Sequence, residues 1–238
     1  MLLDIRHISK QFSEEPVLKD ICLTLQENHT LSILGKSGSG KSTLLKIIAG
    51  LVLQDSGEII LKGTNINTLP ANRRHIVYMS QEPLLFPHLN VFENIAFGLR
   101  INNEKKAVVE QKVNELLTSL GLFSHHKKMP RQLSGGQKQR VNFGRSLIIN
   151  PPLLLLDEPF GNLDTQTRAE MQQLFKQVSK EFNITSIFVT HDIKEALLMG
   201  DNIAYMNTGK LIIYDNKKSF ISDSNTGAQK EITFWQNL

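Results

Sequence analysis

The sequence predicts an α/β fold with a parallel sheet at its core, an antiparallel β region near the N-terminus and an inserted block of helices. Residues 153–156 are four consecutive leucines, a run typical of a strand covered on both faces of a parallel sheet. Between residues 90 and 121 apolar residues recur instead at three- and four-residue steps, which predicts helices. Strands thus alternate with helices along the 238-residue chain, which is long enough to bury a sizeable core.

The first part of the chain contains the predicted antiparallel strands. Short apolar stretches alternate with polar ones over residues 1–34, and Ser-Glu-Glu-Pro at 13–16 marks a turn between two of them. A further pair of strands is expected at 57–61 and 76–79. In the helical block that follows, one apolar face ends at Gly121, which stops the helix. Its members are Val109, Val113, Leu116, Leu117 and Leu120.

The C-terminal half returns to alternating strands and helices. After the strand at 153–156 we expect a helix around 171–178, a buried strand at 186–190, a helix at 193–199 and a hairpin around 207–210. The predicted division is a core with the β subdomain (1–87 and 151–214), an inserted helical subdomain (88–150) and a tail (215–238). The tail is polar until Phe234-Trp235 and receives no assignment.

Composition limits the compartment and the partners. The net charge of +4 is modest, and we expect no nucleic-acid partner. The single cysteine, Cys22, excludes an intrachain disulfide, and we expect it to be a small apolar filler in a cytosolic protein. We expect no signal peptide, and no apolar run approaches the ~20 residues that span a bilayer, so any membrane role should be peripheral. The basic cluster at 125–128 favours a solvated loop over a metal or anion site.

Residues 35–43, Gly-Lys-Ser-Gly-Ser-Gly-Lys-Ser-Thr, fit the P-loop template for binding nucleotide triphosphates. An apolar strand at 31–34 leads into the loop, and a helix at 43–49 with Gly50 as its cap leads out of it. Glycines let successive amides point inward, and the helix N-terminus adds donors and a positive dipole end. The sequence therefore predicts a P-loop NTPase core of the RecA-like type. The residues expected to hold the phosphates are Gly35, Lys36, Ser37, Gly38, Ser39, Gly40, Lys41, Ser42 and Thr43.

The leucine run ends in an acidic pair, Asp157-Glu158, at the edge where α/β sheets bind ligands. Lys41 would supply charge to the β- and γ-phosphates of ATP, and Ser42 and Asp157 would hold Mg²⁺. Glu158, one residue further, could accept a proton from the attacking water. An acidic pair can also simply cap the next helix, but its place in a P-loop protein favours the catalytic interpretation.

Residues 133–140, Leu-Ser-Gly-Gly-Gln-Lys-Gln-Arg, resemble the signature motif of the ATP-binding cassette (ABC) ATPases. The resemblance covers residues 2–214 and implies that Ser134, Gly135, Gly136 and Gln137 belong to the nucleotide site of a second cassette, where Ser134 and Gly136 would contact the γ-phosphate. It also implies that Gln81 ligates Mg²⁺ and senses the γ-phosphate, that Asp164 belongs to the D-loop, that His191 is the switch histidine and that Phe12 stacks on adenine. Each has a plainer alternative: Phe12 as a core residue, Gln81 as a surface amide and His191 as a satisfied buried histidine.

The family resemblance implies an active ATPase with ATP and Mg²⁺ as cofactors, since Glu158 and His191 are both present. It implies a homodimer, or a pair with a second cassette protein, in which ATP is hydrolysed between two subunits. Residues 83–95 look like the stretch in bacterial importer cassettes for ferric iron, polyamines, sulfate, molybdate and sugars that borders the groove for a membrane-subunit helix. The plainer alternative is that Leu84, Leu85, Phe86 and Leu89 pack the helical subdomain. With about two dozen residues after the hairpin, we expect no C-terminal regulatory domain.

The resemblance favours an importer subunit on the cytoplasmic side of the membrane. It would work with integral membrane permease subunits and, through them, an extracytoplasmic substrate-binding protein. An exporter or cell-division-type cassette remains an alternative. So does a non-transport ABC ATPase, although no sustained heptad run predicts the coiled coil of the repair and chromosome types. The transported substrate is not encoded in the chain.

Overall fold

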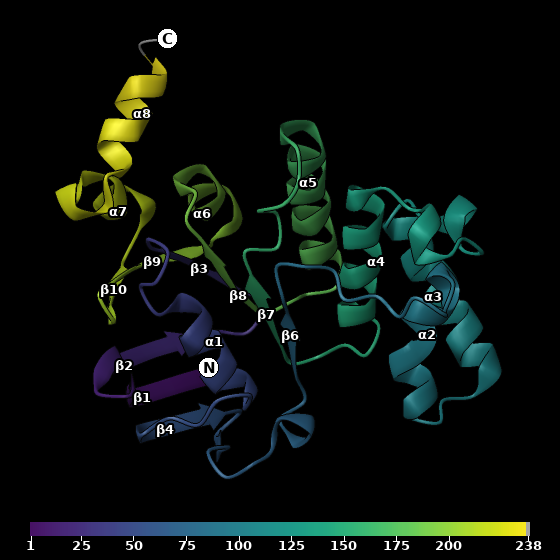
Figure 1. Cartoon of the computed structure of the whole chain (residues 1–238), viewed down its shortest axis with the longest axis horizontal. Coiled ribbons are helices and arrows are strands. Elements are labelled where there is room, and N and C mark those ends of the chain that lie inside the picture. The colour runs from purple at the N-terminus through teal and green to yellow at the C-terminus, as the bar shows by residue number, and fades with distance from the viewer. Residues whose placement is uncertain (237–238) are drawn as a thin grey trace.

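The computed structural model describes residues 1–236, which form two sheets with helices around them (Figure 1). The larger sheet has the strand order β10-β9-β3-β8-β7-β6. The strands from β9 to β6 run parallel, and β10 adds an antiparallel edge. They are β3 (Thr30–Leu34), β6 (Ile76–Met79), β7 (Leu153–Asp157), β8 (Ser186–Thr190), β9 (Asn202–Asn207) and β10 (Lys210–Tyr214). The predicted α/β fold with a parallel core is confirmed.

The smaller sheet is antiparallel, with the order β2-β1-β4-β5. Its strands are β1 (Leu3–Phe12), β2 (Glu15–Leu25), β4 (Ser56–Leu61) and β5 (Thr64–Asn65). A two-residue turn at Ser13 (φ 44°) and Glu14 (φ 75°) joins β1 to β2, as the sequence predicts. The expectation that Cys22 is an apolar filler is wrong: Cys22 lies on the exposed face of β2, and its neighbours in sequence are the buried residues.

The predicted pairing of 57–61 with 76–79 is also wrong. Both segments are strands, but β4 pairs with β1 in the antiparallel sheet, whereas β6 pairs with β7 in the parallel sheet. Between them lie β5 and a 3-10 turn (Ala71–Arg73), along which the chain passes from one sheet to the other. Local pattern cannot identify a strand's partner, because pairing depends on tertiary packing.

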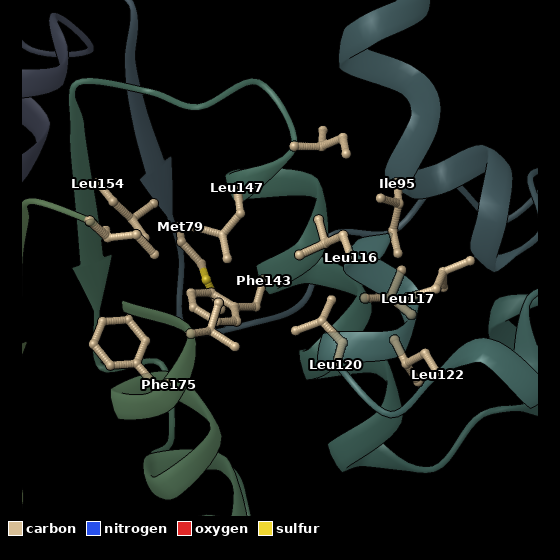
Figure 2. Close-up of a cluster of buried hydrophobic side chains, with 14 of the residues drawn as sticks. Met79, Ile95, Leu116, Leu117, Leu120, Leu122, Phe143, Leu147, Leu154 and Phe175 are labelled. Carbon is tan, nitrogen blue, oxygen red and sulfur yellow. The ribbon is translucent and has the colours of Figure 1, made fainter. Parts of the chain in front are cut away.

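The strand β7 is covered on both faces, which explains its four leucines. Leu153 and Leu155 pack with α1 (Lys41–Ala49) and the antiparallel sheet in one core cluster. Leu154 and Leu156 belong to a second cluster on the opposite face, with α4 (Gly135–Leu147) and α5 (Thr165–Glu181). Figure 2 shows part of this second cluster, in which Met79, Phe143, Leu154 and Phe175 converge. All five β7 residues are buried, so the strand's carboxyl end is firmly positioned.

A helical block connects β6 to β7 and forms one end of the molecule in Figure 1. It consists of α2 (Val91–Ile101), α3 (Lys106–Ser119), two 3-10 turns (Phe123–His125 and Pro130–Gln132) and α4. The predicted apolar face that ends at Leu120 is buried, and Gly121 follows it with φ 65°. The basic cluster lies in and beside the first 3-10 turn, where no group of three metal-ligating side chains occurs among the described residues.

The tail that the sequence left unassigned is helical. It forms α7 (Lys217–Ser222), a 3-10 turn (Ser224–Thr226) and α8 (Ala228–Gln236). Phe220 and Ala228 are fully buried against Leu34 and α6 (Ile193–Met199). The Tyr214 hydroxyl donates a hydrogen bond of 2.6 Å to Asp223 Oδ2, which fixes the start of the tail. Across the described residues, no helix has the length and apolar character needed to cross a membrane.

Candidate functional site

The loop between β3 and α1 depends on glycines with left-handed backbone. Gly38 has φ 77° and Gly40 has φ 106°, values that other residues rarely adopt. A Cβ atom on Gly40 would lie 2.8 Å from the carbonyl oxygen of Val17, so the loop packs closely on β2. Because α1 begins at Lys41, its N-terminus lies at this loop, an arrangement that suits a phosphate group.

Lys41 is held at the base of the loop. Its Nζ donates hydrogen bonds to the carbonyl oxygens of Gly35 (2.7 Å) and Lys36 (3.0 Å). The residue is only 4% exposed, and this burial lowers the pKa of Lys41, although Glu158 and Asp157 act in the opposite direction. The protein's own carbonyl groups thus position the Lys41 ammonium inside the loop.

Two hydroxyl groups donate hydrogen bonds to the Asp157 carboxylate, where β7 ends. Ser42 Oγ donates a hydrogen bond of 2.8 Å to Asp157 Oδ1, and the Tyr78 hydroxyl donates one of 2.6 Å to Asp157 Oδ2. A hydroxyl beside a carboxylate is the oxygen donor set that Mg²⁺ prefers, so these residues fit the predicted metal ligands. Gln81, the third predicted ligand, contacts the D-loop instead: its Nε2 donates to Asn162 Oδ1 at 3.3 Å.

Tyr78 is a site residue that sequence reasoning missed. Burial and the bond to Asp157 both raise the pKa of its hydroxyl, which therefore acts as a donor. We expect Tyr78→Phe to lower kcat for ATP hydrolysis by roughly tenfold, because partners that orient metal ligands typically contribute 10–100-fold. Steady-state kinetics over a range of Mg²⁺ concentrations test this, and an unchanged kcat with unchanged Mg²⁺ dependence would contradict it.

Glu158 lies between a cation and an imidazole. Its Oε2 is 2.9 Å from His191 Nδ1, and its Oε1 is 3.9 Å from Lys41 Nζ. Glu158 also has φ 46°, a left-handed conformation that costs a non-glycine residue roughly 1–2 kcal/mol. Such strain persists where the surrounding structure enforces it, often at functional sites. The geometry therefore brings together three of the four predicted catalytic residues.

A buried carboxyl group, that of Glu195, accepts a hydrogen bond from Thr190, the residue before His191. Glu195, 5% exposed, accepts hydrogen bonds from Thr190 Oγ1 (2.7 Å) and Gln172 Nε2 (3.1 Å). Burial raises the pKa of Glu195. The His191 side chain itself is 62% exposed, so the alternative of a satisfied buried histidine does not apply.

The signature residues lie at the N-terminus of α4, away from the P-loop. Within residues 1–236, no hydrogen bond or ion pair joins the signature residues to the P-loop. Ser134 caps the helix, accepting from the Gln137 amide at 3.3 Å while Gln137 Oε1 accepts from the Ser134 amide at 3.1 Å. A Cβ on Gly135 would have no neighbour within 4 Å, whereas one on Gly136 would lie 2.5 Å from Thr167 Cγ2 of α5. The motif thus presents an open surface at Gly135.

Two further predicted residues, Asp164 and Phe12, lie outside this cluster. Asp164 caps α5 by accepting a hydrogen bond of 3.0 Å from the Thr167 amide, and this bond lowers the pKa of its carboxyl. Phe12 ends β1 with 46% of its surface exposed and with Lys10 Nζ 5.1 Å from its ring centre. It is therefore not a core residue, and its ring is available to stack.

Cavities lie on both sides of the P-loop. One of about 150 Å³ is bounded by Val17, residues 37–43 and Glu158. Another of about 550 Å³ is bounded by Lys36, Ser37, Glu158 and His191 and, on its far side, by residues 224–227 and Lys230 of the tail. No pattern in the sequence indicates that the tail forms this wall. A further cavity, of about 740 Å³, lies elsewhere, beside the β1–β2 turn.

Comparison with known proteins places this geometry in a wider group. Residues 18–161 match the family model described as ABC transporter. The chain is 42% identical over 229 residues to the spermidine/putrescine import ATP-binding protein PotA of Clostridioides difficile, covering 93% of this chain and 66% of that protein. It is 44% identical over 211 residues to the molybdate/tungstate import ATP-binding protein WtpC of Pyrococcus horikoshii, covering 89% and 61%. It is 43% identical over 215 residues to the sulfate/thiosulfate import ATP-binding protein CysA of Yersinia pseudotuberculosis, covering 89% and 59%.

A solved structure supports the same grouping. It is the dimeric post-hydrolysis state of the ATP-binding cassette MJ0796 bound to ADP and Pi, with a TM-score of 0.76 and 33% sequence identity. The alignment covers 88% of this chain and 96% of that one. The curated relatives named above are longer, and the chain spans between 59% and 66% of their length.

Proposed function

The chain belongs to the ABC transporter family, and on this premise we propose that it binds and hydrolyses ATP to drive import through separate membrane subunits. The observation that carries the proposal is the position of Glu158, which lies within 2.9 Å of His191 and 3.9 Å of Lys41 at the edge of the P-loop. A carboxylate beside the γ-phosphate site can take a proton from water. The neighbouring Lys41 ammonium and His191 imidazole can stabilise the negative charge that develops on the phosphate oxygens in the transition state.

Each residue has a defined part in this reaction. Lys41 and the loop amides bind the β- and γ-phosphates, and Glu158 orients the attacking water and accepts its proton. His191, whose Nδ1 faces Glu158, holds that carboxylate and can donate a hydrogen bond from its other nitrogen. Ser42 and Asp157, joined at 2.8 Å, would hold Mg²⁺, which when bound neutralises phosphate charge. Gln81, whose Nε2 donates to Asn162 Oδ1 at 3.3 Å, would sense the γ-phosphate from this position.

We propose that two cassettes share each ATP. Ser134 and Gly135 have no partner in their own P-loop, and the open surface at Gly135 suits a phosphate from a second copy. The similar structure with ADP and Pi is a dimer. Phe12 would stack on the adenine and Asp164 would lie at the contact between the two cassettes.

Import is the direction that the relatives favour. PotA, WtpC and CysA are import ATP-binding proteins for polyamines, molybdate or tungstate, and sulfate or thiosulfate. The chain would therefore act at the cytoplasmic face of the membrane, bound to permease subunits that receive substrate from an extracytoplasmic binding protein. Leu84, 68% exposed within residues 83–95, offers an apolar contact for such a subunit. Loss of substrate uptake in a deletion strain would separate this function from export.

The experiment that tests the shared site is ATP hydrolysis measured over a wide range of protein concentrations. We expect specific activity to rise with concentration until dimers predominate, because a lone cassette lacks the signature contact to its own ATP. Sedimentation in the presence of ATP should show the dimer forming over the same range. Specific activity that stays constant while the protein is monomeric would overturn the shared-site proposal.

A further inference from the structure

A second cluster of reactive side chains comes from two strands, β1 and β2, which are neighbours in the antiparallel sheet. Figure 1 shows the two strands side by side. The cluster consists of His7, Asp20 and Cys22, and a donor atom from each lies within 4.8 Å of the other two. Within the part of the chain that the structure describes, this is the one group of three potential metal ligands that converge in this way. None of the three has a part in the proposed ATPase reaction.

Two irregularities in the strand pairing bring these side chains together. The β1–β2 register shifts beside His7 and again beside Asp20. These two residues have left-handed backbone, with φ 53° and 56°. At the first shift two β1 residues lie opposite Cys22 alone, which is the arrangement of a β-bulge. Bulges redirect side chains, and here the side chains of His7, Asp20 and the exposed Cys22 converge.

The distances distinguish a metal site from a nucleophile. Asp20 Oδ1 lies 2.7 Å and Cys22 Sγ lies 3.7 Å from the same atom, His7 Nδ1. A Cys–His–Asp relay needs the thiol and the carboxylate on opposite ring nitrogens, so that the proton can pass through the ring. Three donor atoms that converge on one point are instead what a metal ion requires.

We propose that His7, Asp20 and Cys22 bind one zinc ion. Thiolate, imidazole and carboxylate are zinc's usual ligands, and tetrahedral bonds of the usual lengths place sulfur and nitrogen about 3.6 Å apart. The Cys22 Sγ and His7 Nδ1 atoms already have this separation. The His7 amide also donates a hydrogen bond of 3.3 Å to Cys22 Sγ, which holds the sulfur beside the His7 ring. Zinc would replace the hydrogen between His7 Nδ1 and Asp20 Oδ1, whose separation of 2.7 Å would widen to about 3.4 Å for tetrahedral bonds. The exposed face leaves the fourth position to water.

The test uses Co²⁺ as a spectroscopic substitute for Zn²⁺ in the full chain, reduced and without nucleotide. We expect one Co²⁺ per chain and a thiolate-to-cobalt charge-transfer band, which can come only from Cys22 because it is the single cysteine. Added Zn²⁺ should abolish the band and raise the melting temperature. Cys22→Ser should remove the band, and His7→Ala and Asp20→Asn should each weaken zinc binding roughly tenfold or more.

The matched control is His29→Ala, which removes an exposed histidine elsewhere and should change neither the spectrum nor the zinc affinity. ATPase activity should be unchanged in Cys22→Ser, because Cys22 lies outside the nucleotide site. Absence of the charge-transfer band from the folded wild-type chain would overturn the proposal. So would one metal ion per two chains, since that stoichiometry indicates a cysteine bridge between copies.

Discussion

Replacing Glu158 with glutamine is expected to lower the rate of ATP hydrolysis by roughly 10²–10⁴-fold, the usual contribution of a general base. Glutamine keeps the size of the side chain and can still bond His191, which lies 2.9 Å from Glu158, but it cannot accept a proton. ATP affinity should change by roughly threefold at most, because Lys41 and the loop amides are untouched. Phosphate release gives kcat, and titration with a fluorescent ATP analogue gives the affinity.

The same variant should accumulate as an ATP-bound dimer, since hydrolysis would no longer separate the subunits. A suitable control is Glu170→Gln, which changes a half-exposed carboxylate that pairs with Arg140 on the helical surface. That variant should keep the wild-type rate. If Glu158→Gln kept most of its activity while His191→Ala lost it, the proton acceptor would be His191, and the proposed roles would be wrong.

The parts of the site that sequence alone predicted are those fixed by local chemistry. The P-loop needs glycines at left-handed positions and a helix that begins at Lys41, and these requirements leave a fixed spacing in the chain. The strand β7 needs apolar residues on both faces, so its four leucines predict both the strand and the acidic pair at its end. Each of these signals lies within a few residues of the feature it predicts.

The contacts that sequence could not predict join distant segments. Tyr78 bonds Asp157 because β6 happens to pair with β7, a choice that the β6 sequence does not reveal. The tail borders the cavity beside His191 because Phe220 packs into a third core cluster, and short helices leave little periodicity to detect. Cys22 alternates with buried residues along β2, and a single cysteine gives no indication of which face it occupies.

Arg74 is a buried residue whose contacts sequence analysis passed over. It is 2% exposed, and its guanidinium donates to four carbonyl oxygens: Ile47 (2.8 Å), Ile48 (3.0 Å), Leu69 (2.9 Å) and Asn67 (3.2 Å). The first two lie at the C-terminus of α1, where carbonyl groups lack the usual helical partner four residues on, although Ile47 also accepts from the Gly50 amide. Arg74 therefore fixes the helix whose other end carries Lys41.

We expect Arg74→Met to lower the free energy of unfolding by about 3–5 kcal/mol, because it leaves buried carbonyls unpaired while methionine fills only part of the space. For a chain of this size the melting temperature should fall by roughly 6–20 °C. Relief from burying a charge opposes this loss, since burial already lowers the pKa of Arg74. The Ile47 carbonyl would keep its hydrogen bond from the Gly50 amide (3.0 Å), but the other three carbonyls would lose their partner, and this loss should outweigh the gain. Urea unfolding followed by circular dichroism measures the balance.

The adjacent residue provides the control. Arg73 has the same side chain but is exposed, so Arg73→Met should change the unfolding free energy by roughly 0.5 kcal/mol or less. The contrast between neighbours isolates the contacts of the buried guanidinium from any effect of charge or of the 3-10 turn. Equal stability of the two variants would mean that water replaces the guanidinium at the end of α1. The P-loop helix would then be positioned by its apolar face alone. A Cβ atom on Gly50 would lie 2.6 Å from Arg74 Nε, so removing the guanidinium should also remove this clash. In the Arg74→Met background, Gly50→Ala should therefore cost only what its φ of 78° imposes on alanine.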